Sequence, residues 1–178
     1  MPNSVFIAAS LDGYIADKEA KLDWLQVIPN RDNCDGGFHR FMDRIDAIVM
    51  GRNTFQTVDG FECEWPYTKP VFVLSNSMST LPTGYENKVQ LIQGPLPDVI
   101  HTLHNKGYQN LYIDGGTTIQ NFLKEDLIDE MIITLIPILL GGGVPLFGEL
   151  SQPLLFEFVK SEVFLNAWVQ NHFRRKKD

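Results

Sequence analysis

With 178 residues, of which 44% are hydrophobic, the chain is long enough to build one core, and we expect a single domain over residues 1–178. A net charge of −7 argues against nucleic acid as a partner, because phosphate backbones are bound by clustered Lys and Arg. No run of about 20 apolar residues indicates a membrane span, and no signal-peptide pattern is present, so we expect a cytoplasmic protein without a membrane partner.

Short apolar runs rich in β-branched residues alternate with segments of helical periodicity over the first two thirds of the chain. This alternation is typical of parallel strands joined by crossover helices. The predicted strands cover residues 5–9, 47–50, 71–74, 89–92 and 111–113. Apolar stripes predict helices at Phe38, Phe41, Met42 and Ile45, at Leu96, Val99, Ile100 and Leu103, and, over a shorter stretch, at Ile119, Phe122 and Leu123.

From about residue 127 the pattern changes to strands without helices. Residues 131–136 form one long apolar run, and residues 154–173 predict two further strands that turn near Leu165 and Asn166. Strands without intervening helices pair antiparallel. We therefore predict an α/β fold whose mixed sheet is parallel in its first part and antiparallel at its C-terminal edge. Residues 60–70 are polar and aromatic and predict a surface loop.

Two predicted strand-to-helix junctions combine glycine with polar side chains. In open α/β sheets, ligands bind beyond the carboxyl ends of the strands, where helix N-termini present free N–H groups. The first junction contains Gly51, Arg52 and Thr54, which offer close backbone approach, a phosphate-binding guanidinium and a hydroxyl donor. The second contains Gly115 and Gly116. Each junction alone is also typical of a tight turn, but the pair favours a dinucleotide with separated phosphates.

Other features bear on which dinucleotide is bound. The Rossmann fingerprint G-x-G-x-x-G and the P-loop motif are absent. Residues 141–143 are three glycines, but Pro145 follows and we expect the preceding strand to be antiparallel, so we predict a sharp loop there. The strand at residues 71–74 is followed by residues 75–77, Ser-Asn-Ser, and not by the acid that binds an NAD ribose. With Arg52 nearby, these neutral groups accommodate a 2′-phosphate, so the expected cofactor is NADPH.

Several motifs in chain order resemble the dihydrofolate reductase superfamily. They are SLDGYIA at residues 10–16, MGRNTF at residues 50–55 and IDGG at residues 113–116. Residues 127–130 and 136–147 make the chain more similar to the reductase domain of the bifunctional riboflavin-biosynthesis deaminase-reductase and its stand-alone relatives. The resemblance covers about residues 5–174. It implies an eight-stranded mixed sheet with helices on both faces, NADP(H) as cofactor, and a homodimer.

The resemblance also implies which residues bind the cofactor. Arg52 and Thr54, after Gly51, would hold the adenosine-side phosphates. Leu74 and Ser75 would border the adenine and its ribose, and the pyrophosphate would be held by Gly115, Gly116 and Thr117. Ala9 and Ile15 would flank the nicotinamide.

Two further residues are candidates on the substrate side. Asp12 is the acid expected closest to the transferred hydride, and therefore the candidate catalytic residue, although a turn-forming role before Gly13 fits it equally. Trp24 is the candidate substrate-binding residue, with an ordinary place in the core as its alternative.

The chain also departs from the family. Asp35 has the spacing of the carboxylate of dihydrofolate reductases but lies in a loop-like stretch, and Asp43 falls on the solvent side of its helix. The deaminase signatures H-x-E and P-C-x-x-C are absent, so no deaminase domain is expected. Residues 21–25 lack the hydroxyl side chains that help to hold a ribose phosphate. We expect no metal, because neither the cysteines, Cys34 and Cys63, nor the pair His101 and His104 has the remaining ligands of a zinc site.

These observations predict an NADPH-dependent oxidoreductase, similar to 5-amino-6-(5-phosphoribosylamino)uracil reductase of riboflavin biosynthesis. It would transfer hydride to a small heterocyclic or ribosylamino-pyrimidine-like substrate. Three alternatives remain: an NADP(H)-binding protein without turnover, a pterin or dihydrofolate reductase, and a structural module whose glycines only form turns.

Overall fold

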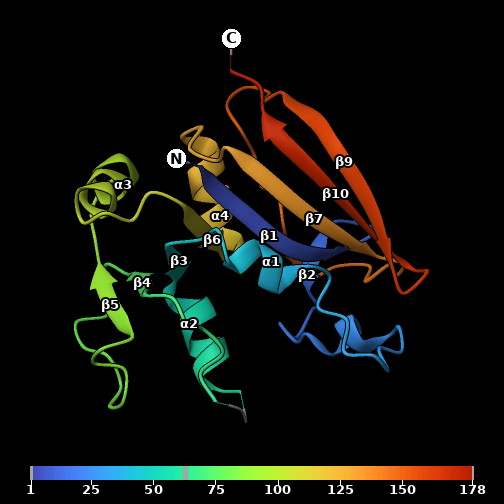
Figure 1. The fold of residues 1–178 in the computed structure, drawn as a ribbon, viewed down its shortest axis with the longest axis horizontal. Coiled ribbons are helices and arrows are strands. Elements are labelled where there is room, and N and C mark those ends of the chain that lie inside the picture. The colour runs from blue at the N-terminus through green and yellow to red at the C-terminus, as the bar shows by residue number, and fades with distance from the viewer. Residues whose placement is uncertain (1, 62–63, 178) are drawn as a thin grey trace.

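An eight-stranded mixed sheet organises the chain (Figure 1), with the strand order β5-β4-β3-β6-β1-β7-β10-β9. The structure is a computed structural model and describes residues 2–61 and 64–177. The strands of this sheet are β1 (Asn3–Ser10), β3 (Ala47–Gly51), β4 (Val71–Leu74), β5 (Val89–Ile92), β6 (Leu111–Asp114), β7 (Glu130–Ile136), β9 (Phe156–Phe164) and β10 (Trp168–Arg175). All eight coincide with the apolar runs that predicted them, to within two residues at their ends.

The direction of the strands confirms the predicted mixed sheet and corrects one detail. The strands from β5 to β7 are paired parallel, whereas β10 is antiparallel to both β7 and β9. The expectation that the strand before residues 141–143 is antiparallel was wrong with respect to β1, because β7 pairs parallel with β1 from Ser4↔Glu130 to Ser10↔Ile136. The helix that precedes β7 provides the crossover. The turn between β9 and β10 lies at Leu165 and Asn166, as predicted, and both residues have positive φ.

Helices cover both faces of the sheet, as predicted. One face packs α1 (Phe38–Met42) and α2 (Arg52–Asp59), and the other packs α3 (Leu96–Asn105) and α4 (Gly116–Lys124). The α1 helix ends at Met42, before the last residue of its predicted stripe, yet Ile45 is still fully buried. In the described parts of the chain, no helix has the length and apolar character needed to cross a membrane.

Three short elements lie outside the eight-stranded sheet, and the sequence did not predict them. The strands β2 (Tyr14–Ala16) and β8 (Val144–Pro145) pair antiparallel in a separate sheet, and η1 (Asp23–Gln26) is a single 3-10 turn. The predicted sharp loop at residues 141–143 brings β8 to β2, and its three glycines have φ of 67°, 141° and 138°. A Cβ atom at Gly143 would collide with the backbone oxygen of Ala16, so the close approach of the two segments requires glycine there.

The segment at residues 60–70 is a loop, as predicted, and Phe61 is exposed, but two of its aromatic side chains, Trp65 and Tyr67, are partly buried. The Trp65 ring packs against the rings of Phe55, Tyr67 and Tyr85, with centroid distances of 5.9, 5.3 and 4.9 Å. Trp65 and Tyr67 are only partly exposed. The prediction of a surface loop was therefore wrong for Trp65 and Tyr67, because packing of these rings outweighs the polar character of their neighbours. Cys63 lies outside the described residues.

Candidate functional site

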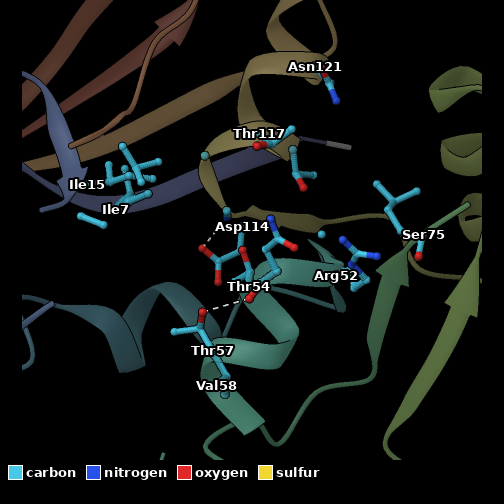
Figure 2. A pocket seen from close by; sticks show the side chains of 18 of the residues that line it. Ile7, Ile15, Arg52, Thr54, Thr57, Val58, Ser75, Asp114, Thr117 and Asn121 are labelled. Atoms are coloured by element: carbon cyan, nitrogen blue, oxygen red, sulfur yellow. Dashed lines mark hydrogen bonds between the residues drawn. The ribbon is translucent and has the colours of Figure 1, made fainter. Parts of the chain in front are cut away.

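A cavity of about 850 Å³ lies at the carboxyl ends of the parallel strands (Figure 2). The ends of β3, β4 and β6 line it, together with the first turns of α2 and α4 and with residues from β1 and β2. This is the location expected for a ligand in an open α/β sheet. The two predicted junctions open onto the same cavity, because β3 and β6 are adjacent parallel strands, with Met50 opposite Asp114.

The two junctions pack against each other through a reciprocal pair of glycine and threonine contacts. A Cβ atom at Gly51 would lie 2.8 Å from Oγ1 of Thr118 on α4, and one at Gly115 would collide with Oγ1 of Thr54 on α2. Gly115 also has a φ of 94°, which other residues adopt at a cost. Each glycine therefore makes room for the helix that begins at the other junction. The result is a pair of helix N-termini, side by side, whose backbone N–H groups border the cavity.

One end of the cavity is polar. Arg52 donates a hydrogen bond from its guanidinium to Ser77 Oγ over 2.8 Å, and Ser75 Oγ accepts hydrogen bonds from the backbone N–H groups of Ser77 (3.3 Å) and Met78 (2.9 Å). Figure 2 shows Arg52 beside Ser75 at the end of β4. Arg52 is exposed to solvent, so its guanidinium can reach a ligand phosphate without leaving a buried position.

The other end of the cavity is apolar. Ile7 of β1 and Ile15 of β2 lie there, on the opposite side of Asp114 from Arg52 and Ser75 (Figure 2). Further apolar side chains from other segments also line the cavity: Leu22, Leu25, Val58, Phe61 and Val144. A cavity with one charged end and one apolar end suits an amphipathic ligand or two ligands of different polarity.

Asp114, the last residue of β6, lines the middle of the cavity. Its Oδ1 accepts the backbone N–H of Gly115 (2.8 Å), and its Oδ2 is 3.4 Å from the hydroxyl of Tyr67. Burial raises the pKa of Asp114 above its usual value, although the hydrogen bonds act in the opposite direction. Burial and the neighbouring Asp114 carboxyl raise the pKa of Tyr67 well above its usual range. The site therefore contains a carboxyl group that retains its proton more readily than an exposed one.

Neither Asp114 nor Tyr67 was among the predicted site residues. For Asp114 a signal was present, since a carboxylate that directly precedes a glycine junction at the end of a strand lies where ligands bind. No comparable signal marked Tyr67, which comes from the loop before β4, packs against Trp65 and donates a hydrogen bond to Asp114.

Most of the residues predicted to bind the cofactor line this one cavity. They are Ile15, Gly51, Arg52, Thr54, Leu74, Ser75, Gly115, Gly116 and Thr117. Ala9 is the exception, because it is 1% exposed and belongs to the core. Ile7 and Ala8 of the same strand line the cavity in its place.

Asp12 and Trp24 do not line the cavity. Asp12 accepts hydrogen bonds from Ser10 Oγ (2.5 Å) and from the backbone N–H groups of Leu140 (3.1 Å) and Gly141 (2.8 Å), and the bond from Ser10 lowers its pKa. These contacts tie the loop after β1 to the loop after β7, which agrees with the alternative role in turn formation. Trp24 is 7% exposed and buried, while its neighbours Leu22 and Leu25 line the cavity.

The two carboxylates considered for proton donation also lie elsewhere. Asp35 and Asp43 are exposed at the two ends of α1, and neither lines the cavity. Among residues 2–61 and 64–177, no group of three or more His, Cys, Asp or Glu side chains is placed to hold a metal ion.

Comparison with known proteins agrees with the resemblance seen in the sequence. Residues 4–170 match the model of the family described as RibD C-terminal domain. The uncharacterized protein YwjB of Bacillus subtilis (strain 168) is 34% identical over 174 residues, which are 96% of each chain. A crystal structure from Shewanella sp. PV-4, of a protein provisionally assigned to riboflavin biosynthesis, is 62% identical, with a TM-score of 0.98 over 99% of this chain and 100% of that one.

A more distant structure shows the type of fold. Dihydrofolate reductase from Enterococcus faecalis, solved in complex with NADP(H) and RAB-propyl, has a TM-score of 0.69 at 17% identity, over 99% of this chain and 97% of that one. The fold is therefore of the dihydrofolate reductase type, as the motifs predicted. Because the family model matches residues 4–170 of the 178 in this chain, the chain belongs to the RibD C-terminal domain family.

Proposed function

We propose that this chain is an NADPH-dependent reductase that transfers a hydride to a small heterocyclic or ribosylamino-pyrimidine-like substrate. The observation that carries this function is the pair of helices α2 and α4, which begin side by side on one cavity whose far ends are cationic and apolar. Helix N-termini and guanidinium groups bind phosphates, and apolar walls bind flat rings. Membership of the RibD C-terminal domain family supports the same class of reaction.

The residues present fit a dinucleotide. Gly51 and Gly115 make room for the Thr118 and Thr54 side chains, so α2 and α4 begin close together, and a pyrophosphate could bind at the backbone N–H groups of Gly116 and Thr117. Arg52 and Thr54 would hold the adenosine-side phosphates, with Leu74 and Ser75 next to the adenosine. We favour NADPH over NADH because Arg52, Ser75 and Ser77 are cationic or neutral where a 2′-phosphate would lie.

In this proposal the chain positions the reactants and the cofactor supplies the hydride. The apolar end, with Ile7 and Ile15, would orient a flat substrate and exclude water from it. Asp114, whose pKa is raised by burial, would hold or donate a proton next to the substrate. We propose it for this role in place of Asp12, because the Asp12 carboxylate lies outside the cavity and already accepts three hydrogen bonds.

Binding of NADPH by the Arg52→Ala variant tests this function. A charge-assisted hydrogen bond contributes about 1.5–3 kcal/mol, so we expect the Kd for NADPH to rise by about ten- to a hundredfold and the Kd for NADH to change much less. Quenching of tryptophan fluorescence during titration measures both constants. Arg31→Ala, which removes an exposed arginine outside the cavity, is the matched control and should bind as the wild type does. Unchanged NADPH binding by Arg52→Ala would remove the assigned phosphate site.

One observation favours the alternative that the chain binds NADP(H) without turnover. The exposed positions of Asp35 and Asp43 leave the cavity without the carboxylate that α1 provides in dihydrofolate reductases, which favours binding of NADP(H) without turnover over reduction of dihydrofolate. Loss of NADPH absorbance at 340 nm in the presence of a dihydropterin or an aminopyrimidine would exclude binding without turnover.

A further inference from the structure

The loop before β4 brings a tyrosine hydroxyl to the cavity. Tyr67 lines the cavity and donates a hydrogen bond to Asp114 Oδ2 over 3.4 Å. Its ring packs against Trp65, which in turn packs against Phe55, a fully buried residue of α2. This series of ring contacts from the core limits where the Tyr67 hydroxyl can lie relative to the end of β6.

A second tyrosine acts on the same carboxyl but donates its proton elsewhere. Tyr112 is buried two residues before Asp114 on β6, and its hydroxyl donates its single proton to the backbone oxygen of Phe6 over 3.0 Å. Within the described parts of the chain, Tyr67 therefore remains as the side chain that directs an O–H at Asp114. Burial and the Asp114 carboxyl raise the pKa of Tyr67 well above its usual range, so this hydroxyl keeps its proton and stays a donor.

Asp114 needs hydrogen-bond donors most when it is ionised. It is only partly exposed, and burial raises its pKa, whereas hydrogen bonds from Gly115 and the two tyrosines lower it. A carboxylate in such a position is costly unless donors point at it. The Gly115 N–H serves Oδ1 at 2.8 Å, and Tyr67 serves Oδ2. Hydrogen bonds to a charged acceptor are shorter and stronger, so the bond from Tyr67 favours the carboxylate over the protonated form.

We propose that Tyr67 is a positioning residue, whose hydroxyl holds the Asp114 carboxyl in one orientation and stabilises the carboxylate that is left when Asp114 gives up its proton. This role rests on the proposed reductase function, which it deepens. In that reaction Asp114 gives its proton to the substrate atom next to the carbon that accepts the hydride from NADPH, and solvent returns a proton to Asp114 after the product leaves. Tyr67 stays protonated throughout and acts only through Asp114.

Infrared titration of the full chain, without cofactor or substrate, tests this role directly. The C=O stretch of a protonated carboxyl group reports its ionisation, and subtracting the spectrum of the Asp114→Asn variant in the same background isolates Asp114. Tyr67→Phe removes the donated proton and keeps the ring that packs against Trp65. We therefore expect the titration midpoint of Asp114 to move to higher pH in Tyr67→Phe. A midpoint that is unchanged, or that moves to lower pH, would overturn the proposal.

Tyr85→Phe is the matched control for the aromatic packing. Tyr85 contacts the same Trp65 ring at 4.9 Å and donates its hydroxyl proton to Asp59 Oδ1 over 2.5 Å, and neither Tyr85 nor Asp59 lines the cavity. The variant removes an equivalent bond between tyrosine and aspartate, and it should leave the titration of Asp114 unchanged. A move of the same size in both variants would assign the effect to the packing around Trp65, against the proposal.

Turnover distinguishes this role from the proposed function. With 5-amino-6-(5-phosphoribosylamino)uracil as the probe, Tyr67→Phe should lower kcat for NADPH oxidation by about tenfold and leave KM nearly unchanged, because the lost bond is strongest to the carboxylate formed during the reaction. A wild-type kcat in Tyr67→Phe would overturn the proposal. A wild type that oxidises no NADPH with this probe or with a dihydropterin contradicts the reductase function instead, and the infrared titration gives its result without turnover.

Discussion

The Asp35 carboxylate accepts hydrogen bonds from the backbone N–H groups of His39 and Gly37, at 2.9 Å each, and contacts the ring of His39 at 2.5 Å. These bonds, with those from His39 first, lower the pKa of Asp35 to about 2. They satisfy N–H groups at the start of α1 that have no partner within the helix. At the scale of single residues, the carboxylate that the spacing offered as a proton donor is therefore explained by helix capping.

Removal of this cap should weaken folding in a pH-dependent way. We expect Asp35→Ala to lower the free energy of unfolding by about 1 kcal/mol near neutral pH. Folding lowers the pKa of Asp35 from 3.8 to about 2. The contribution of Asp35 to the free energy of unfolding is therefore present above about pH 4 and is lost as the pH falls towards 2. Urea denaturation of both proteins at about pH 6 and pH 2.5 measures the difference.

Asp35→Asn is the control for capping, since the single side-chain oxygen of asparagine can still accept one of the two N–H bonds without titrating. It should be more stable than Asp35→Ala at about pH 6. Both variants should keep the NADPH affinity of the wild type, because Asp35 does not line the cavity. Loss of NADPH binding in both variants, with folding intact, would show that Asp35 acts on the site and not only on α1.

At the scale of elements, the sequence predicted the helices and strands that a local pattern of apolar residues specifies. The strands β4 and β5 match their predicted ranges to the residue, because each is a run of alternating or fully apolar residues of the length typical of a strand. The strands β2 and β8 were missed, since each is at most three residues long and their pairing joins Ala16 to Val144 across most of the chain. No local pattern specifies such a partner.

The cavity likewise has parts that local sequence patterns specify and parts that depend on tertiary packing. Glycines and polar side chains at strand ends identified the two junctions, because the carboxyl ends of parallel strands share one edge of the sheet. Leu22, Phe61 and Tyr67 come from loops whose course depends on tertiary packing, so their arrival at the cavity could not be predicted from the sequence. Ala9 lies on the same face of β1 as Ile7, because side chains alternate along a strand, but it is 1% exposed within the core, whereas Ile7 and Ala8 reach the cavity.

The contact between Gly115 and Thr54 predicts how a substitution would affect α2 and α4. Gly115→Ala would place a Cβ atom against Thr54 Oγ1 at a φ of 94°, so α2 and α4 must move apart. We expect the free energy of unfolding to fall by about 1–3 kcal/mol because of the backbone conformation, and to fall further because of the collision. NADPH binding should be at least about tenfold weaker. Urea denaturation and fluorescence titration measure the two effects.

Gly107 provides a matched control for the backbone conformation alone. It has the same φ of 94°, but no atom lies within 4 Å of its Cβ position. Gly107→Ala should therefore show the conformational cost without the collision and should leave NADPH binding unchanged. If Gly107→Ala and Gly115→Ala had equal effects on stability and on binding, the packing between the junctions would have no role in forming the site.

At the scale of the whole molecule, the C-terminal edge of the sheet has an apolar surface that the helices do not bury. Phe158 and Val163 of β9 are each 64% exposed and Val169 of β10 is 39% exposed, and Phe158 and Val163 are paired across the strands with Phe173 and Val169. The β9–β10 hairpin lies at the opposite side of the sheet from α3 (Figure 1), and β9 is its outermost strand. Exposed apolar side chains on an edge strand are typical of a surface that another chain covers.

We expect this surface to form the homodimer that the family resemblance implies. The wild type should then elute in size-exclusion chromatography with light scattering at about twice the 20.2 kDa of one chain. The double variant Phe158→Lys and Val163→Lys should elute as a monomer, since two buried cations in a symmetric interface are repelled and desolvated. Leu139→Lys changes a 70% exposed residue outside this surface and should leave the dimer intact. A wild type that is monomeric at micromolar concentration, or a double variant that is still dimeric, would contradict this assignment of the β9–β10 surface.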